Sequence, residues 1–155
     1  MVAKKKSARK PTKRAAKRRP ARPTRKKPET LRLRAANPGF TVNDIERSIA
    51  WYRDILGCAV AERWERDGKL LGASMRAGTV DFNLGQDDWK KGRDRVKGEG
   101  FRIYATTSQD IDALAARIKA RGGVLLHEPR TAPWGERDFA VADPDGFKIT
   151  ISRAR

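Results

Sequence analysis

His127 is the only histidine of the chain and the side chain best suited to proton transfer. Histidine exchanges a proton near neutral pH, so this residue could act as a general acid or base if it leaned over a bound ligand. The residues His127-Glu128-Pro129-Arg130 predict a polar loop, just after a short strand predicted at residues 124–126. No nucleophile or carboxylate is spaced to act with it, so a surface position is the favoured interpretation.

Four tryptophans, many for 155 residues, could supply a flat wall for a planar ligand. We interpret Trp51 and Trp134 as packing residues of their segments. Trp64, near the end of a predicted strand, and Trp89, in a linker, are better candidates for the rim of a site. Aromatic residues dominate ordinary cores, so packing is favoured even for these two.

Cys58 is the only cysteine, so the chain can form neither an internal disulfide nor a cysteine zinc cluster. A small buried hydrophobe in a reducing compartment is the natural interpretation. No apolar run is long enough to span a membrane, and the basic N-terminus lacks the apolar segment of a secretory signal. The sequence therefore predicts a cytoplasmic protein with no membrane partner.

The positive charge is concentrated at the N-terminus. The formal net charge is +17, yet residues 1–28 hold 14 of the 36 Lys and Arg residues and none of the 19 acidic ones. Like charge and proline with few apolar side chains predict a disordered tail over residues 1–34. Without aromatic residues for base stacking, the tail would contact nucleic acid only through electrostatics, and incidental contact is favoured over a selected function. The candidate contacts are Lys4, Lys5, Lys6, Lys17, Arg18 and Arg19.

A strand followed by a capped helix opens the globular domain, which we place at residues 35–155. Residues 40–42 predict the strand and residues 43–57 the helix, which Asn43 or Asp44 can cap and Gly57 can end. The plan recurs with a strand at 103–106 and a helix at 108–122. Three strand-like runs follow each helix, at residues 59–64, 70–76 and 79–84, and then at 124–126, 138–142 and 147–152.

Two tandem βαβββ modules place the chain in the α+β class. Each sheet is too small to stand alone, so we expect the two to join edge to edge as a cup-shaped mixed sheet with the helices outside. A duplicated ferredoxin-like unit competes, but it needs a second helix in each half. Asp143-Pro144-Asp145-Gly146 predicts the turn of the last hairpin. The charged linker at residues 85–100 could fold over the mouth of the cup or form a dimer contact.

Two motifs carry a resemblance to a known family. The helix Asp44 to Gly57, and Pro133-Trp134-Gly135 followed by the turn at residues 143–146, are similar to the vicinal oxygen chelate superfamily. That family includes glyoxalase I, fosfomycin-modifying enzymes, extradiol dioxygenases and bleomycin-binding proteins. The resemblance covers roughly residues 37–152 and implies the fold, but a fold does not fix the chemistry.

In metal-dependent members of this family, His, Gln or Glu ligands come from the first and last strands of each module. The resemblance puts Asn37 and Arg102 at the first-strand positions, and Asp81 (or Asn83, one pleat away) and Thr150 at the last-strand positions. Arginine cannot ligate a metal, and threonine and asparagine are poor ligands. Since a catalytic metal usually needs three protein ligands, the resemblance implies a site that has lost its metal and holds no cofactor.

A different use of the same positions follows if Asp81 and Arg102 face the cup. Arg102 could then hold the carboxylate or phosphate of a ligand, with neutral side chains as further partners. A structural salt bridge between Asp81 and Arg102 is an equally weighted alternative. The predicted ligand-binding set is Asn37, Trp64, Asp81, Asn83, Arg102, Tyr104 and Thr150.

Three functions are therefore under consideration. The first is a metal-free protein that binds a small molecule, as the bleomycin-binding group does, and forms a homodimer. The second is a glyoxalase-like lyase or isomerase that holds a divalent metal with a shifted ligand set, which leaves open whether the protein is an enzyme. The third is a nucleic-acid-associated protein acting through the basic tail, and it is compatible with the first.

Overall fold

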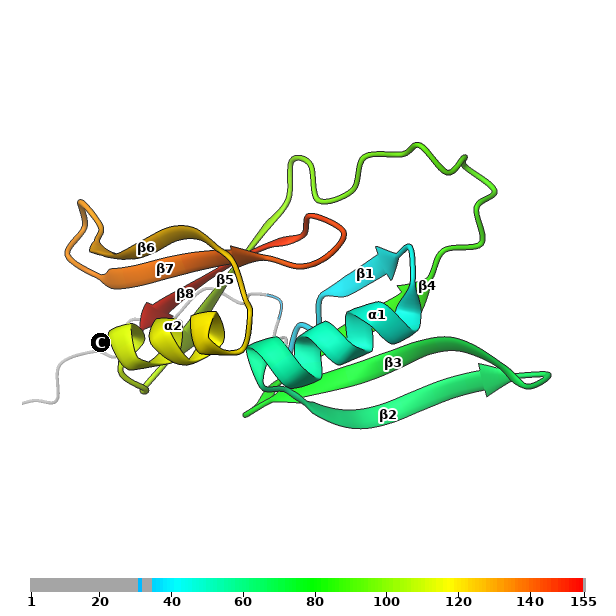
Figure 1. Cartoon of the computed structure of the whole chain (residues 1–155), viewed down its shortest axis with the longest axis horizontal. Helices are drawn as coiled ribbons and strands as arrows, with labels where there is room; N and C mark the ends of the chain where they lie inside the picture. The colour runs from blue at the N-terminus through cyan, green and yellow to red at the C-terminus, as the bar shows by residue number, and fades with distance from the viewer. Residues whose placement is uncertain (1–30, 32–34, 155) are drawn as a thin grey trace, which may run out of the picture. The chain divides into compact units, whose positions relative to one another are not determined.

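Module 1 of the computed structural model contains the first predicted strand, helix and three-stranded run (Figure 1). The structure describes residue 31 and residues 35–154, so the six cationic candidates of the tail lie outside the described residues. The elements of module 1 are β1 (Gly39–Val42), α1 (Ile45–Ala50), the π-helical segment η1 (Trp51–Leu56), β2 (Ala59–Arg66), β3 (Lys69–Ala77) and β4 (Val80–Gln86).

Module 2 repeats the plan in the same order and so confirms the predicted duplication. Its four strands pair as β5-β8-β7-β6, and those of module 1 pair as β1-β4-β3-β2. In each sheet the first strand lies parallel to the last, while the other pairs are antiparallel. The elements of module 2 are β5 (Arg102–Thr107), α2 (Ile111–Ala120), β6 (Leu125–Thr131), β7 (Arg137–Ala142) and β8 (Lys148–Arg153).

The two sheets are separate hydrogen-bonded ladders rather than one sheet joined at its edges. Packing joins the modules, because the buried hydrophobic residues of both belong to one cluster. Phe40 of β1 stacks on Phe147, just before β8, with ring centroids 4.5 Å apart, and it meets Phe101 edge-on at 6.2 Å. The α+β class and the two modules are as predicted, but side chains rather than strand pairing connect them.

Both helices begin at the predicted type of cap. The Asp44 carboxylate accepts from the Arg47 N–H at 3.0 Å, and the Asp110 carboxylate accepts from the Ala113 N–H at 2.8 Å. Each bond satisfies an N–H that the first helical turn leaves free. The first helix departs from expectation by continuing as the π-helical η1 before it ends at Gly57, whose φ is +88°.

The predicted turn between β7 and β8 is built around Asp143. Its Oδ1 accepts from the N–H groups of Asp145 and Phe147 at 3.0 and 2.9 Å, and Gly146 supplies a φ of +90°. The Tyr52 hydroxyl donates to the other carboxylate oxygen at 3.3 Å. Burial raises the pKa of the Asp143 carboxyl, while the two backbone donors act in the opposite direction. The turn thereby binds module 2 to η1 of module 1.

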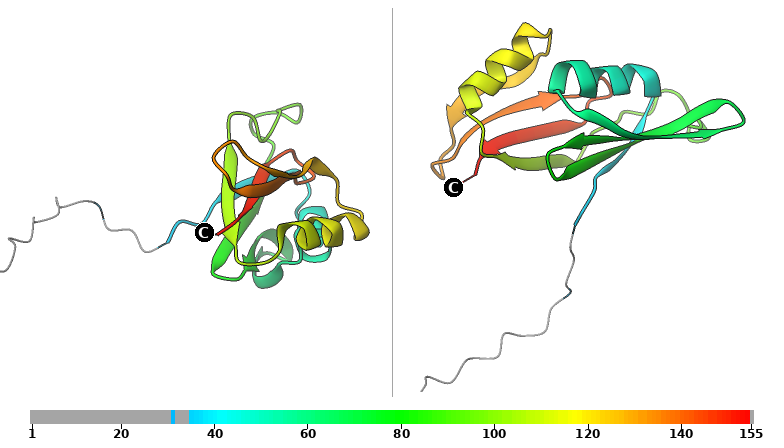
Figure 2. Two further views of the ribbon diagram at one scale, coloured as in Figure 1. Left: turned by 90° about the vertical axis from the view of Figure 1, so that its left-hand side faces the viewer. Right: turned by 90° about the horizontal axis from the view of Figure 1, so that it is seen from below.

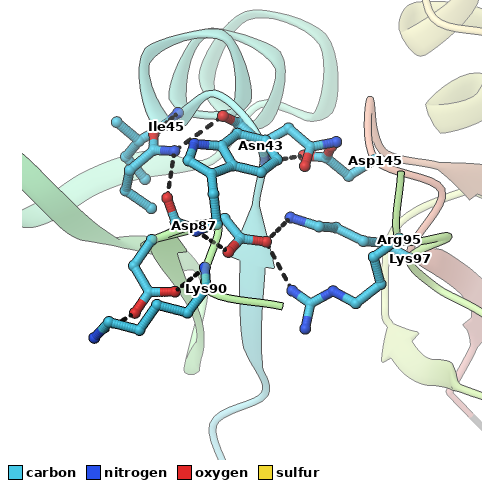
Figure 3. Close-up of polar contacts among 10 residues, drawn as sticks. Asn43, Ile45, Asp87, Lys90, Arg95, Lys97 and Asp145 are labelled. Carbon is cyan, nitrogen blue, oxygen red and sulfur yellow. Dashed lines mark hydrogen bonds and ion pairs between the residues drawn. The ribbon is translucent and has the colours of Figure 1, made fainter. Parts of the chain in front are cut away.

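The linker between the modules is anchored at Asp87, which is buried (Figure 3). Its carboxylate accepts from Lys97 Nζ and from the Arg95 guanidinium, both at 2.7 Å, and from the Trp89 N–H at 2.9 Å. The hydrogen bond from Lys97 makes the largest contribution and that from Trp89 the next largest, and the pKa of Asp87 is lowered to about 2. Residues 87–97 are therefore pinned back to the end of β4, and Trp89 packs against the cations Arg93 and Lys97.

β6 is longer than the strand predicted at residues 124–126, and it includes His127. His127 pairs with Ala140 and Arg130 with Asp138, with the register irregular between them. Pro129 suggested a loop, but β6 is an edge strand, where a missing N–H costs no ladder bond. The placement of His127 in a polar loop was therefore wrong.

Both helices lie on one side of the strands (Figure 2, right). Core residues such as Phe82, Leu84, Ile149 and Ile151 point to that side. Because strand side chains alternate, their neighbours point to the opposite faces, which we call the open face of module 1 and the open face of module 2. No helix in the described part of the chain is long and apolar enough to cross a lipid bilayer.

Candidate functional site

The open face of module 1 carries a closed ion pair. Asp81 of β4 lies opposite Arg76 of β3, and the guanidinium donates to both carboxylate oxygens at 2.8 and 3.0 Å. These bonds hold the pKa of the Asp81 carboxyl below its usual range. Asp81 is the best metal ligand among the predicted positions, but both of its carboxylate oxygens accept hydrogen bonds from Arg76. The sequence prediction did not include Arg76.

A tryptophan and an asparagine accompany this pair. Trp64 of β2 lies opposite Gly72 of β3, and its exposed fraction is 38%. A Cβ atom at Gly72 would stand 2.6 Å from the Trp64 ring, so glycine is needed for the indole to lie on the strand. Asn83 is half-buried beside Ser74 and Gly39. Asn37 precedes β1 by two residues and is exposed, outside any strand.

The open face of module 2 holds the other three predicted residues together. Arg102 Nη1 donates to Thr150 Oγ1 across the β5–β8 pair at 3.1 Å. Thr150 is only 4% exposed, whereas Tyr104, directly opposite it, is 72% exposed. The three side chains form one patch in which the hydroxyl of Thr150 holds the guanidinium of Arg102 in place.

Asp81 and Arg102 do not form the salt bridge that was weighed as an alternative. Asp81 is paired with Arg76, and among the described residues Arg102 has no carboxylate partner. A guanidinium has five N–H donors in a fixed plane and no acceptor. With one neutral partner, Arg102 retains donors that can take a carboxylate or phosphate in a two-point contact.

His127 has a partner that the sequence analysis missed. On the open face of module 2 its Nε2 lies 3.9 Å from Oδ1 of Asp138, a buried carboxylate of β7. Arg130 Nε lies 3.5 Å from the same oxygen. The signal that could have identified Asp138 is an acidic residue inside an otherwise apolar strand, Asp138-Phe139-Ala140-Val141.

These donor sets do not fit the divalent metal that the fold suggests. Among the described residues, no three His, Cys, Asp or Glu side chains gather closely enough to hold a metal ion. At the positions concerned stand an arginine, a threonine and a carboxylate already bound by Arg76. Burial raises the pKa of the Cys58 thiol to about 11, so that cysteine is a poor source of thiolate at neutral pH.

Cavities of the described chain lie away from the predicted ligand-binding set. One, of about 1080 Å³, lies between the modules, where η1, the β3–β4 turn and α2 meet. Another, of about 280 Å³, lies where the linker crosses β1 at Gly39 and Thr41. None of the seven predicted ligand-binding residues lines either of these two cavities. Trp134, predicted to pack, is also largely exposed.

Known proteins share both the sequence pattern and the fold. The chain is 32% identical over 127 residues to the bleomycin resistance protein of Geobacillus stearothermophilus, covering 74% of this chain and 92% of that one. It is 25% identical over 122 residues to a lactoylglutathione lyase of Arabidopsis thaliana, but spans only 41% of the length of that protein.

Among solved structures, a glyoxalase-related enzyme from Fulvimarina pelagi matches 79% of this chain and 89% of its own with a TM-score of 0.62. At 19% identity, that match concerns the fold alone. The family model described as Glyoxalase/Bleomycin resistance protein/Dioxygenase superfamily matches residues 34–151. The chain therefore belongs to the glyoxalase/bleomycin resistance protein/dioxygenase superfamily.

Proposed function

We propose that this protein binds a small anionic molecule on its open faces without a divalent metal, and that it sequesters this molecule rather than converting it. The observation that carries the proposal is Arg102. Its guanidinium is held on the open face of module 2 by the Thr150 hydroxyl and has no carboxylate partner among the described residues.

Neighbouring side chains suit a planar ligand. Tyr104 stands exposed beside Thr150, and on module 1 the Trp64 indole lies flat against Gly72. Aromatic faces favour stacking with flat rings, while Arg102 would hold an acidic group at the ring edge. An aromatic carboxylate combines both features and is therefore the ligand class we propose.

A second copy of the chain completes the proposed site. The predicted ligand-binding residues line neither of the two cavities described above, and small-molecule sites normally enclose most of the ligand. The open face of module 2, which bears Tyr104, and that of module 1, which bears Trp64, would each be covered by another protomer. We therefore propose a homodimer. Sedimentation velocity should give twice the chain mass, and a monomer at micromolar concentration would contradict this part of the proposal.

Calorimetric titration with 1-naphthoate tests the role of Arg102. In Arg102→Gln the affinity should fall by about 10- to 100-fold, which corresponds to the loss of a hydrogen-bonded charge contact. Arg66→Gln on β2 removes the same charge from an exposed position and should leave the affinity unchanged. Equal binding by the wild type and Arg102→Gln would contradict the proposal.

The metal-dependent alternative has a separate test. Several relatives are named lactoylglutathione lyases. Formation of S-lactoylglutathione can therefore be measured after dialysis against EDTA and again after adding Ni²⁺ or Zn²⁺. We expect no turnover in any condition and unchanged naphthoate binding. Activity that disappears with EDTA and returns with metal would instead support the lyase.

A further inference from the structure

Among the described residues, two buried polar atoms on the open face of module 2 have no hydrogen-bond partner, and they lie close together. They are Nε2 of His127 and Oδ1 of Asp138, 3.9 Å apart. Asp138 is only 2% exposed. Buried polar atoms nearly always have partners, and a buried carboxylate that lacks donors is costly, so this pair calls for a physical explanation.

The ring orientation shows what the pair needs. His127 Nδ1 lies 3.1 Å from the backbone carbonyl oxygen of Glu128. A carbonyl only accepts, so this contact is a hydrogen bond only in the tautomer that carries the proton on Nδ1, and the proposal below rests on that tautomer. In the neutral ring, Nε2 is then an acceptor as well. Two acceptors, an imidazole nitrogen and a carboxylate oxygen, therefore lie 3.9 Å apart and closed to solvent, and only a donor that enters between them can satisfy both.

Arg130 is a nearby hydrogen-bond donor, but it does not satisfy the two acceptors. Its Nε lies 3.5 Å from Asp138 Oδ1, longer than a good charge-assisted hydrogen bond, and its side chain is largely exposed. A cationic N–H group near the carboxylate is thus compatible with the site. The geometry nevertheless leaves both acceptors without a bond.

We propose that His127 and Asp138 form a binding site for the primary ammonium group of a ligand. An ammonium group has three N–H donors and a positive charge, so it can donate to both acceptors and neutralise the buried carboxylate. Water could supply donors but not the charge. A metal ion is a poor alternative, because the site offers two ligands and a neighbouring guanidinium. This inference goes beyond the proposed function and does not depend on Arg102.

The single histidine gives a direct readout. Long-range ¹⁵N–¹H NMR of the full chain at pH 8 yields one pair of imidazole nitrogen signals, which report the tautomer of His127 without assignment. We would titrate n-butylamine, which is cationic at this pH, and compare n-butanol and butyrate at equal ionic strength. The ammonium probe should shift the Nε2 signal in a saturable manner, and the neutral and anionic probes should not.

Three variants separate this site from general charge effects. Asp138→Asn should weaken butylammonium binding at least tenfold. Glu128→Gln removes a neighbouring carboxylate that faces α2 and pairs with Lys119, so binding should be unchanged. Arg130→Gln removes the resident cation, so binding should become several-fold tighter.

Two results would overturn the proposal. One is a saturable shift of the same size in Asp138→Asn. The other is a free wild-type protein whose His127 carries protons on both ring nitrogens at pH 8, because Asp138 would then already have its donor. Neither readout involves naphthoate or Arg102, so the ammonium site and the anion site can fail separately.

Discussion

The open faces of the two modules have the same strand order, but they differ in how their charged side chains are paired. On module 1, Arg76 and Asp81 satisfy each other in a two-point contact between neighbouring strands. On module 2, within the part of the chain that the structure describes, Arg102 has only a hydroxyl partner, and Asp138 and His127 each have one side-chain atom without a hydrogen bond. The open face of module 1 thus carries a satisfied ion pair, whereas the corresponding groups on module 2 have incomplete partners.

This contrast indicates how the modules divide the work. A satisfied ion pair has little left to offer a ligand, since binding must first break it. Unpartnered buried groups cost stability in the free protein and regain it when a ligand supplies the missing donors or acceptors. Module 2 should therefore determine which charged groups are bound, while module 1 supplies shape and the Trp64 surface.

The strongest test of module 1 as a shaped surface is Gly72→Ala. The added Cβ would stand 2.6 Å from both the Trp64 ring and the Leu84 carbonyl oxygen, so strand and indole must move. We expect a loss of roughly 1–3 kcal/mol and a fall in melting temperature on the order of 10 °C. Tryptophan emission should shift to the red as Trp64 leaves the strand. A melting temperature within 1 °C of wild type would show that the face is not rigid.

Asp138→Asn should raise the stability of the protein, in contrast to Gly72→Ala. The amide removes a buried charge and can donate to His127 Nε2, so we expect a gain of about 1 kcal/mol, or roughly 4 °C in melting temperature. Differential scanning calorimetry at pH 8 would measure it. A clear loss of stability would mean that Asp138 is structural, and the contrast between the modules would weaken.

Asp81→Asn should have the smallest effect, because the Arg76 partner of its ion pair is largely exposed to solvent. Arg76 lowers the pKa of the Asp81 carboxyl. The pair therefore stabilises the protein at pH values above the ordinary pKa of an aspartate. That contribution is lost as the pH falls through the lowered value. Melting curves of wild type and variant should differ slightly at pH 7 and converge as the pH falls below the ordinary pKa of an aspartate. A difference that grows on acidification would have the wrong sign.

Local signals predicted much of the fold. Asp44 and Asp110 cap their helices, Gly57 ends η1 in the left-handed region, and the turn at Asp143 forms as expected, because each depends on a few neighbouring residues. Short β-rich runs likewise indicated the eight strands, although β6 extends well beyond the predicted residues. The π-helical continuation of α1 had no comparable local signal.

The candidate site was less accessible, because its contacts depend on strand register. Arg76 meets Asp81 across a hairpin, and His127 meets Asp138 through an irregular pairing on an edge strand that contains Pro129. Residue types alone suggested a loop there and a salt bridge between Asp81 and Arg102. The Arg102 to Thr150 contact, by contrast, follows from the parallel pairing of the first and last strands of the module.

The most direct test of the contrast is calorimetric titration of 1-naphthoate into Arg102→Gln and Arg76→Gln side by side. Both variants remove one guanidinium from an open face, one from each module. The proposed division of roles predicts at least tenfold weaker binding for Arg102→Gln and an affinity within about twofold of wild type for Arg76→Gln. Equal losses in the two variants, or a larger loss in Arg76→Gln, would contradict it.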